Sequence, residues 1–133
     1  MYIPEGYGTV FPYMMVEGAE ALTVFLSRVF DANVQGKSVL PDGRVANIRI
    51  RIGTSTFMLS EAGEGAMPAK PGSYYIYVPD VDQAFKTALE LGAQAIFEPT
   101  DMPYEDRQAG IYDPSGNAWW ISHRLVETPY DAQ

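Results

Sequence analysis

Polar and apolar residues alternate most regularly between Arg44 and Ile52, where isoleucines occupy one face and polar side chains the other. A two-residue period predicts a half-buried strand. Aromatic and β-branched residues predict further strands at Thr9 to Val16 and at Thr56 to Glu61. From Glu17 onward, apolar residues recur three and four positions apart, which predicts an amphipathic helix.

The same order of elements returns after Ala62 to Gly72, a segment rich in glycine, proline and alanine that predicts a linker. The two halves also match in apolar spacing, which indicates an internal duplication of a βαβββ unit. We therefore predict one domain over residues 1–133, with units at about residues 8–61 and 73–123 and a linker at 62–72. The elements expected in the second unit are a strand Ser73 to Val78, a helix Asp80 to Leu91, and strands near Ala95 to Phe97, Gly110 to Asp113 and Ala118 to His123.

The composition excludes several classes of function but does not identify one. The net charge of −8 opposes binding to nucleic acids and to anionic membrane surfaces. No cysteine is present, so disulfides, zinc–thiolate sites and cysteine nucleophiles are excluded. No run of 18 apolar residues indicates a membrane span, and no basic leader opens the sequence. We expect a cytoplasmic protein with no nucleic-acid or membrane partner.

Several short motifs occur along the chain: PEGYGTVFPYMMV near the start, PDGR, IRIG, YVPDVD, YEDR, and DPSGNAWWISH at the end. Their order and spacing resemble those of the vicinal oxygen chelate superfamily, which contains glyoxalase I, extradiol dioxygenases and bleomycin-resistance proteins. Within that superfamily the sequence is most similar to the PhnB-like branch. The resemblance implies an α+β fold in which two βαβββ units form a cup-shaped mixed sheet, and it implies a homodimer.

The resemblance also implies where a metal would bind. In catalytic members the cup holds a divalent metal ion on four side chains, and the matching positions here are Phe11, Met58, Ser73 and Trp120. None of these is a strong ligand for zinc, iron, nickel or manganese. Where PhnB-like proteins often carry a histidine and a glutamate, this sequence has Asn47 and Arg49. We therefore expect no metal and no cofactor.

Two adjacent tryptophans on the last predicted strand must face opposite ways. On the cup geometry implied by the resemblance, Trp119 packs beneath a helix and Trp120 faces the cup. Trp120 then either fills the space of a lost metal or forms an aromatic wall for a ligand. The same parity assigns aromatic residues from both units to the cup, where they form a ligand site, a collapsed core or a dimer interface. They are Phe11, Tyr13, Tyr75 and Tyr77.

Charged residues leave similar alternatives open. Arg49 and Arg51 point either to solvent or into the cup, where they would bind a carboxylate, phosphate or phosphonate. Asp106 and Arg107 either hold a loop by an ion pair or, with Tyr104, bring Arg107 to a ligand. His123 is expected at the surface rather than as a catalytic base. The predicted ligand-binding residues are Phe11, Tyr13, Asn47, Arg49, Met58, Tyr75, Tyr77, Tyr104, Arg107 and Trp120.

Three functions follow from this pattern. The first is metal-independent binding or sequestration of a small anionic or aromatic organic molecule, as in antibiotic-resistance-like members of the superfamily. The second is a lyase, isomerase or transferase that keeps a metal on non-standard ligands or uses tyrosine and arginine alone. The third is a non-catalytic interaction module. The sequence does not decide whether any catalysis occurs.

Overall fold

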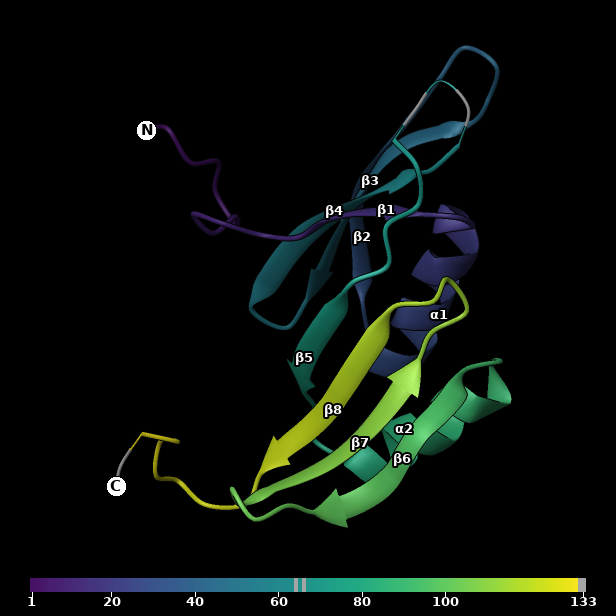
Figure 1. Cartoon of the computed structure of the whole chain (residues 1–133). Helices are drawn as coiled ribbons and strands as arrows, with labels where there is room; N and C mark the ends of the chain where they lie inside the picture. The colour runs from purple at the N-terminus through teal and green to yellow at the C-terminus, as the bar shows by residue number, and fades with distance from the viewer. Residues whose placement is uncertain (64, 66, 132–133) are drawn as a thin grey trace. The chain divides into compact units, whose positions relative to one another are not determined.

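The alternating isoleucine segment forms β3 (Val45–Ile52), an inner strand of a four-stranded sheet in the order β1-β4-β3-β2. β1 (Tyr13–Val16) runs parallel to β4 (Ser55–Glu61), and the other neighbours are antiparallel. The computed structural model describes residues 1–63, 65 and 67–131. It divides into two units, Met1–Gly72 and Ser73–Gln133, each with its own sheet (Figure 1).

In the first unit, α1 (Ala19–Phe30) packs against β3 and β4. Its three- and four-residue apolar spacing buries Leu22, Phe25 and Leu26 against the alternate apolar residues of the strands. The first turn of α1 has no capping side chain of its own, because Gly18 is the N-cap residue. The Glu61 carboxylate at the end of β4 supplies the missing acceptor.

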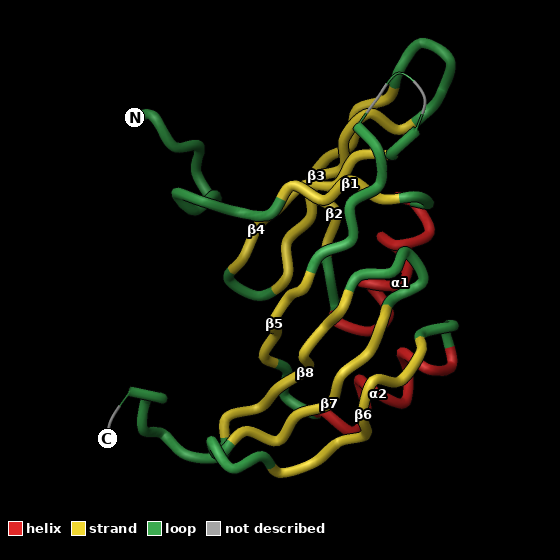
Figure 2. Tube along the Cα trace, viewed as in Figure 1, coloured by secondary structure: helices red, strands yellow, loops and turns green. Residues whose placement is uncertain are grey.

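An edge strand, β2 (Asn33–Val39), escaped the sequence analysis. None of its residues is buried, so it carries no apolar alternation that could have revealed it. It pairs antiparallel with β3 through two register irregularities. Figure 2 shows this strand beside β3 in the first sheet.

The second unit repeats the order of the first. Its sheet runs β5-β8-β7-β6, with β5 and β8 parallel and the remaining pairs antiparallel. The helix α2 packs against β6, β7 and β8 (Figure 1). The Asp80 side chain accepts the backbone N–H of Gln83 at 3.0 Å and caps the helix from within its own sequence. The elements are β5 (Ser73–Tyr77), α2 (Val81–Glu90), β6 (Gln94–Asp101), β7 (Asp106–Tyr112) and β8 (Ala118–Arg124).

Two boundaries in the second unit differ from the sequence analysis. The strand expected near Ala95 to Phe97 extends over the whole of β6. Asp106, expected in a loop, is the first residue of β7, and its side chain has no exposed surface. Polar residues at the start of β7 hid this part of the strand, because the apolar pattern begins only at Ala109.

Each sheet thus has one face toward its helix and an opposite face, called here the open face. The strand register is equivalent in the two units, since Tyr13 lies beside Met58 and Tyr75 lies beside Trp120. Two four-stranded mixed sheets with one helix each confirm the α+β βαβββ prediction. Among the described residues, no helix is long and apolar enough to cross a membrane.

Candidate functional site

The open face of the first unit carries four of the predicted site residues. Tyr13, Met58 and Arg49 lie side by side on β1, β4 and β3. Asn47 is two residues before Arg49, and it donates to the Tyr13 hydroxyl at 3.4 Å. The Tyr13 hydroxyl lies 2.7 Å from Ser60 Oγ, and since Ser60 donates to a backbone carbonyl, Tyr13 is the donor to Ser60.

Arg49 is held flat against the sheet. Its Nη1 donates to Asn47 Oδ1 at 2.9 Å and to Ser38 Oγ at 3.2 Å. Its Nη2 lies over Gly36 on β2, where an added Cβ would come within 2.5 Å. Gly36 therefore leaves the space that the guanidinium occupies.

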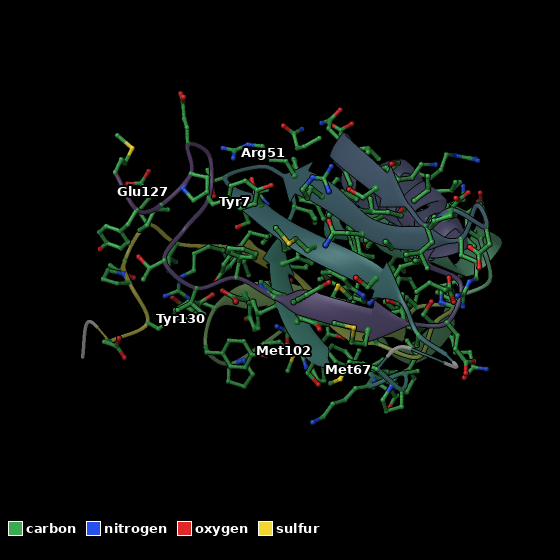
Figure 3. The ribbon with its side chains drawn as sticks, turned by 90° about the horizontal axis from the view of Figure 1, so that it is seen from above. Tyr7, Arg51, Met67, Met102, Glu127 and Tyr130 are labelled. Atoms are coloured by element: carbon green, nitrogen blue, oxygen red, sulfur yellow. The ribbon has the colours of Figure 1, made fainter. Side chains whose placement is uncertain are left out.

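Arg51 lies on the same face and reaches the segment before β1. Its Nη1 donates to the Gly6 carbonyl at 3.1 Å and to Thr56 Oγ1 at 2.9 Å, beside Tyr7 (Figure 3). Phe11 lies before β1 rather than on it, and its ring packs against Tyr7 at a centroid distance of 5.2 Å.

On the second unit, the two tryptophans separate as their parity predicts. Trp119 is 3% exposed, donates from Nε1 to Asp113 at 2.8 Å and packs against the Tyr74 ring. Trp120 is half-buried on the open face, beside Tyr75.

Asp106, the first residue of β7, is the centre of a hydrogen-bond cluster on this open face. Its Oδ2 accepts hydrogen bonds from the hydroxyls of Tyr75 and Tyr130, each at 2.5 Å, and its Oδ1 accepts from Arg124 at 3.2 Å. The Tyr77 hydroxyl lies 2.6 Å from that of Tyr130. Because Tyr130 already donates its only hydroxyl proton to Asp106, Tyr77 is the donor in this contact.

Four tyrosines surround a shallow, open depression of about 450 Å³ on this face. Tyr75 and Tyr77 come from β5, with ring centroids 5.4 Å apart, and Tyr104 precedes β7. Tyr130 follows β8, and Figure 3 shows it on the ribbon beyond that strand. Tyr104 donates to Gln108, whose amide donates to Ser122 Oγ at 2.7 Å. We call these four rings, with Asp106 behind them, the tyrosine face.

The hydrogen bonds set the protonation of this cluster. Burial alone would raise the pKa of Asp106, but the hydrogen bonds from Tyr130, Tyr75 and Arg124 outweigh it and hold the pKa below its usual value. Burial and the bond to Asp106 raise the pKa of Tyr75 and of Tyr130. At neutral pH the cluster is one carboxylate with phenols that remain protonated, so these tyrosines are donors rather than bases.

Arg107 does not form the ion pair with Asp106 that was one of the alternatives in the sequence. Adjacent strand residues point to opposite faces, so Arg107 instead makes a two-pronged ion pair with Asp82 at 2.7 and 2.8 Å. It also donates to Asp101 at 3.0 Å, and these bonds raise its pKa. Arg107 thus joins β7 to β6 and to the start of α2.

The positions that hold a metal in catalytic superfamily members do not fit one here. Met58 and Trp120 offer a thioether and an indole on the two open faces. Glu61, the nearest carboxylate along β4, accepts the backbone N–H groups of Gly18 and Ala19 at 2.9 Å each, so it serves α1. Within the described ranges, no three histidine, aspartate or glutamate side chains gather as a metal site would require. His123 is exposed, with Nδ1 2.8 Å from the Val78 carbonyl.

Sequence reasoning missed three residues that organise the tyrosine face. Asp106 was placed in a loop, while Arg124 and Tyr130 were given no role. One signal was present: Gln108 and Gly110 alternate with Ala109 and Ile111, and the same two-residue period extended backward puts Asp106 on the face of Gln108 and Gly110. The segment that contains Tyr130 has no hydrophobic period that could have indicated the position of this residue.

Residues 10–121 match the model of the Glyoxalase/Bleomycin resistance protein/Dioxygenase superfamily. The chain belongs to this superfamily, which confirms the resemblance seen in the sequence at the level of the superfamily. An uncharacterized protein of Mycobacterium bovis is 28% identical over 130 residues, covering 90% of this chain and 86% of its own.

Solved structures share the fold at low identity. TioX from Micromonospora sp. ML1 has a TM-score of 0.71 at 21% identity, covering 86% of this chain and 96% of its own. The fosfomycin resistance protein FosX from Listeria monocytogenes has 0.68 at 17%, covering 90% and 95%. A PhnB protein from Bacillus cereus, described as a putative 3-demethylubiquinone-9 3-methyltransferase, has 0.67 at 16%, covering 87% and 99%.

Proposed function

We propose that this protein binds a small aromatic organic molecule on the tyrosine face and does so without a metal ion. One observation carries the proposal: four tyrosines line an open depression around a buried carboxylate that is held by hydrogen bonds. Aromatic rings combined with a few convergent polar groups are typical of small-molecule sites. Tyrosine rings also contribute large contact area at low cost in conformational entropy.

Protonation favours binding over proton transfer. A tyrosine that abstracts a proton needs a lowered pKa, whereas the pKa values of Tyr75 and Tyr130 are raised. Asp106 is ionised but already accepts from three side chains. The groups on the tyrosine face therefore suit holding a ligand, and the alternatives of a lyase, isomerase or transferase have no observation in their favour.

An anion is a second candidate ligand, on the open face of the first unit. Among the described residues, neither Arg49 nor Arg51 has a carboxylate within 4.0 Å, although the chain carries a net charge of −8. An unpaired guanidinium held in place is suited to carboxylate, phosphate or phosphonate.

The proposal also covers the biological role of the protein and its branch of the superfamily. Sequestration of a toxic compound is compatible with the name of the fosfomycin resistance protein among the structural neighbours. One neighbour at 16% identity supports placing the chain in the PhnB-like branch. We also propose a homodimer, which rests on the superfamily resemblance, and a cytoplasmic location, which is the expectation from the sequence.

The binding proposal is tested with acetophenone, a neutral aromatic probe that has no hydrogen-bond donor. Saturation-transfer NMR should show the probe bound to the wild-type protein. Tyr77→Ala should weaken binding about twofold to tenfold, because a lost aromatic contact is worth about 0.5–1.5 kcal/mol. Tyr2→Ala is the matched control, since Tyr2 is 92% exposed and lies on the other unit.

Metal dependence is read in the same samples. Dialysis against EDTA should leave acetophenone affinity unchanged, and native mass spectrometry of gently purified protein should show a dimer without bound metal. Equal weakening in Tyr2→Ala and Tyr77→Ala would place the probe elsewhere. Loss of binding after EDTA, restored by a divalent metal, would refute metal independence.

A further inference from the structure

Tyr130 occupies the tyrosine face in the manner of a bound ligand. Its hydroxyl donates to Asp106 at 2.5 Å and accepts from Tyr77 at 2.6 Å. Its ring lies on the Arg124 guanidinium, 4.2 Å from Cζ to the ring centroid. This phenol is therefore held at both ends: the ring by a flat cation, and the hydroxyl by one acceptor and one donor.

Tyr130 is held differently from its neighbours. Tyr75 and Tyr77 belong to β5, where the ladder with β8 fixes the backbone. Tyr130 lies beyond β8 in a segment without strand or helix (Figure 2), and its residue is 41% exposed. Arg124 Nε and Nη2 donate to the Thr128 carbonyl at 3.0 and 2.8 Å and bring this segment to the sheet. Side-chain contacts of this kind can be exchanged without unfolding a strand.

We propose that the ligand of the tyrosine face is a neutral phenol, whose ring and hydroxyl take the place of Tyr130, and that Tyr130 competes with it within the chain. This inference rests on the proposed function, because it assumes that the tyrosine face binds small molecules. Asp106 accepts a proton donor and repels an anion, so a phenolic hydroxyl fits where an aryl carboxylate or phosphate does not. Arg124 supplies the flat surface on which the ring stacks.

Two probes of nearly equal shape test the ligand class. 4-Methylphenol can donate to Asp106, whereas 4-methylanisole carries a methyl group in place of that proton. Each is titrated into the wild-type protein, Tyr130→Ala and Tyr130→Phe, with affinity measured from the amide NMR shifts of β7 and β8. Tyr130 lies outside the sheet, so both variants are expected to fold.

Removing the competitor should strengthen binding of the phenol. Tyr130→Ala is expected to bind 4-methylphenol about tenfold more tightly than wild type. The reason is that the apparent affinity is the intrinsic affinity multiplied by the fraction of molecules in which Tyr130 has left the site open. Tyr130→Phe keeps the ring but loses both hydroxyl contacts, and an intermediate gain of about threefold is expected. Opening the site should raise the affinity for 4-methylanisole by a similar factor, but Tyr130→Ala should bind 4-methylanisole about tenfold more weakly than 4-methylphenol, because this probe leaves Asp106 without a donor.

The outcomes separate this inference from the proposed function. Weaker 4-methylphenol binding by Tyr130→Ala, with acetophenone still bound by wild type, would make Tyr130 a wall of the site and overturn the inference alone. Equal affinity of Tyr130→Ala for the two probes would overturn the phenol class. If none of the three proteins bound any of the probes, acetophenone included, the proposed function itself would fail.

Discussion

In each sheet, one row of paired residues crosses the four strands at the equivalent register. Each row contains one glycine, but the glycine lies on β2 in the first unit and on β7 in the second. In the first unit Arg49 on β3 lies opposite Gly36 on β2, and in the second Phe97 on β6 lies opposite Gly110 on β7. In both cases the large side chain covers the glycine: an added Cβ would come within 2.5 Å of Arg49 Nη2 or 2.7 Å of Phe97 Cε1. The full rows are Tyr13–Met58–Arg49–Gly36 and Tyr75–Trp120–Gly110–Phe97.

The duplicated fold has therefore kept its register while the chemistry of the open faces has diverged. The first unit presents guanidinium groups with no carboxylate partner among the described residues. The second presents phenols around a carboxylate, with Asp106 four residues before Gly110 on the same strand face. The equivalent residue of the first unit, four positions before Arg49, is Val45, which is apolar and buried. One fold thus carries two surfaces of opposite chemical character.

The largest expected effect concerns Asp106, which has no counterpart in the first unit. Asp106→Asn should lower the free energy of unfolding by about 2–3 kcal/mol at pH 7, because charged hydrogen bonds from two phenols and Arg124 are lost. The folded-state pKa of Asp106 lies below its usual value. Its stabilisation is therefore present at neutral pH and is lost as the pH falls through that folded-state pKa.

Urea unfolding from pH 7 down to pH 2 measures this effect. The difference between wild type and Asp106→Asn should be constant near neutrality and should narrow below about pH 4. Asp82→Asn is the control, since Asp82 is exposed and pairs with Arg107, so its effect should be much smaller. A difference that stays constant to pH 2 would contradict a stabilising carboxylate.

The two glycines should differ in their tolerance of alanine. Gly110→Ala places a methyl group against the Phe97 ring and the Ile96 Cβ, and overpacking of this kind costs about 2 kcal/mol. At Gly36 the obstacle is the flexible end of Arg49, which can move away, so Gly36→Ala should stay within about 0.5 kcal/mol.

Thermal unfolding of the two variants compares them directly. Phe97→Ala in the Gly110→Ala background should recover part of the loss, because the ring that meets the new methyl group is gone. Equal costs at Gly36 and Gly110 would show that the covering side chain does not determine tolerance.

A smaller difference is expected at the helix starts. Glu61→Ala should destabilise the protein by about 1 kcal/mol, because two N–H groups at the start of α1 lose their acceptor. Asp80→Asn should change stability little, since asparagine caps a helix about as well as aspartate. Denaturant unfolding with and without EDTA should give the same loss for Glu61→Ala, whereas dependence on metal would make Glu61 a ligand.

The features that the sequence predicted correctly are those in which buried and exposed residues alternate along the chain. The parity of Trp119 and Trp120 followed from simple alternation, and one residue is buried while the other is half-buried. β2 was invisible because an edge strand with no buried residue has no apolar period. Asp106 was misplaced because its hydrogen-bond partners include Arg124 and Tyr130, which no local pattern connects to it. Periodicity reports which face a residue occupies, but not which distant side chain covers it.

The smallest expected effect tests whether the first unit binds anions where the second binds phenols. Phenylphosphonate should shift amide NMR signals on β2 and β3 rather than those on β7 and β8, since Arg49 carries an unpaired guanidinium and Asp106 repels an anion. Arg49→Gln should weaken phenylphosphonate binding about threefold, the modest value expected for a charge that is open to solvent.

Arg28→Gln, which removes a charge from the last turn of α1 instead, serves as the control for net charge. Equal weakening in both variants would mean that the probe responds to overall charge alone. Shifts confined to β7 and β8 would mean that the tyrosine face accepts anions, and the contrast in ligand charge between the units would be wrong. Shifts on β2 and β3 that depend on Arg49 but not on Arg28 would leave the two open faces with opposite preferences on one duplicated fold.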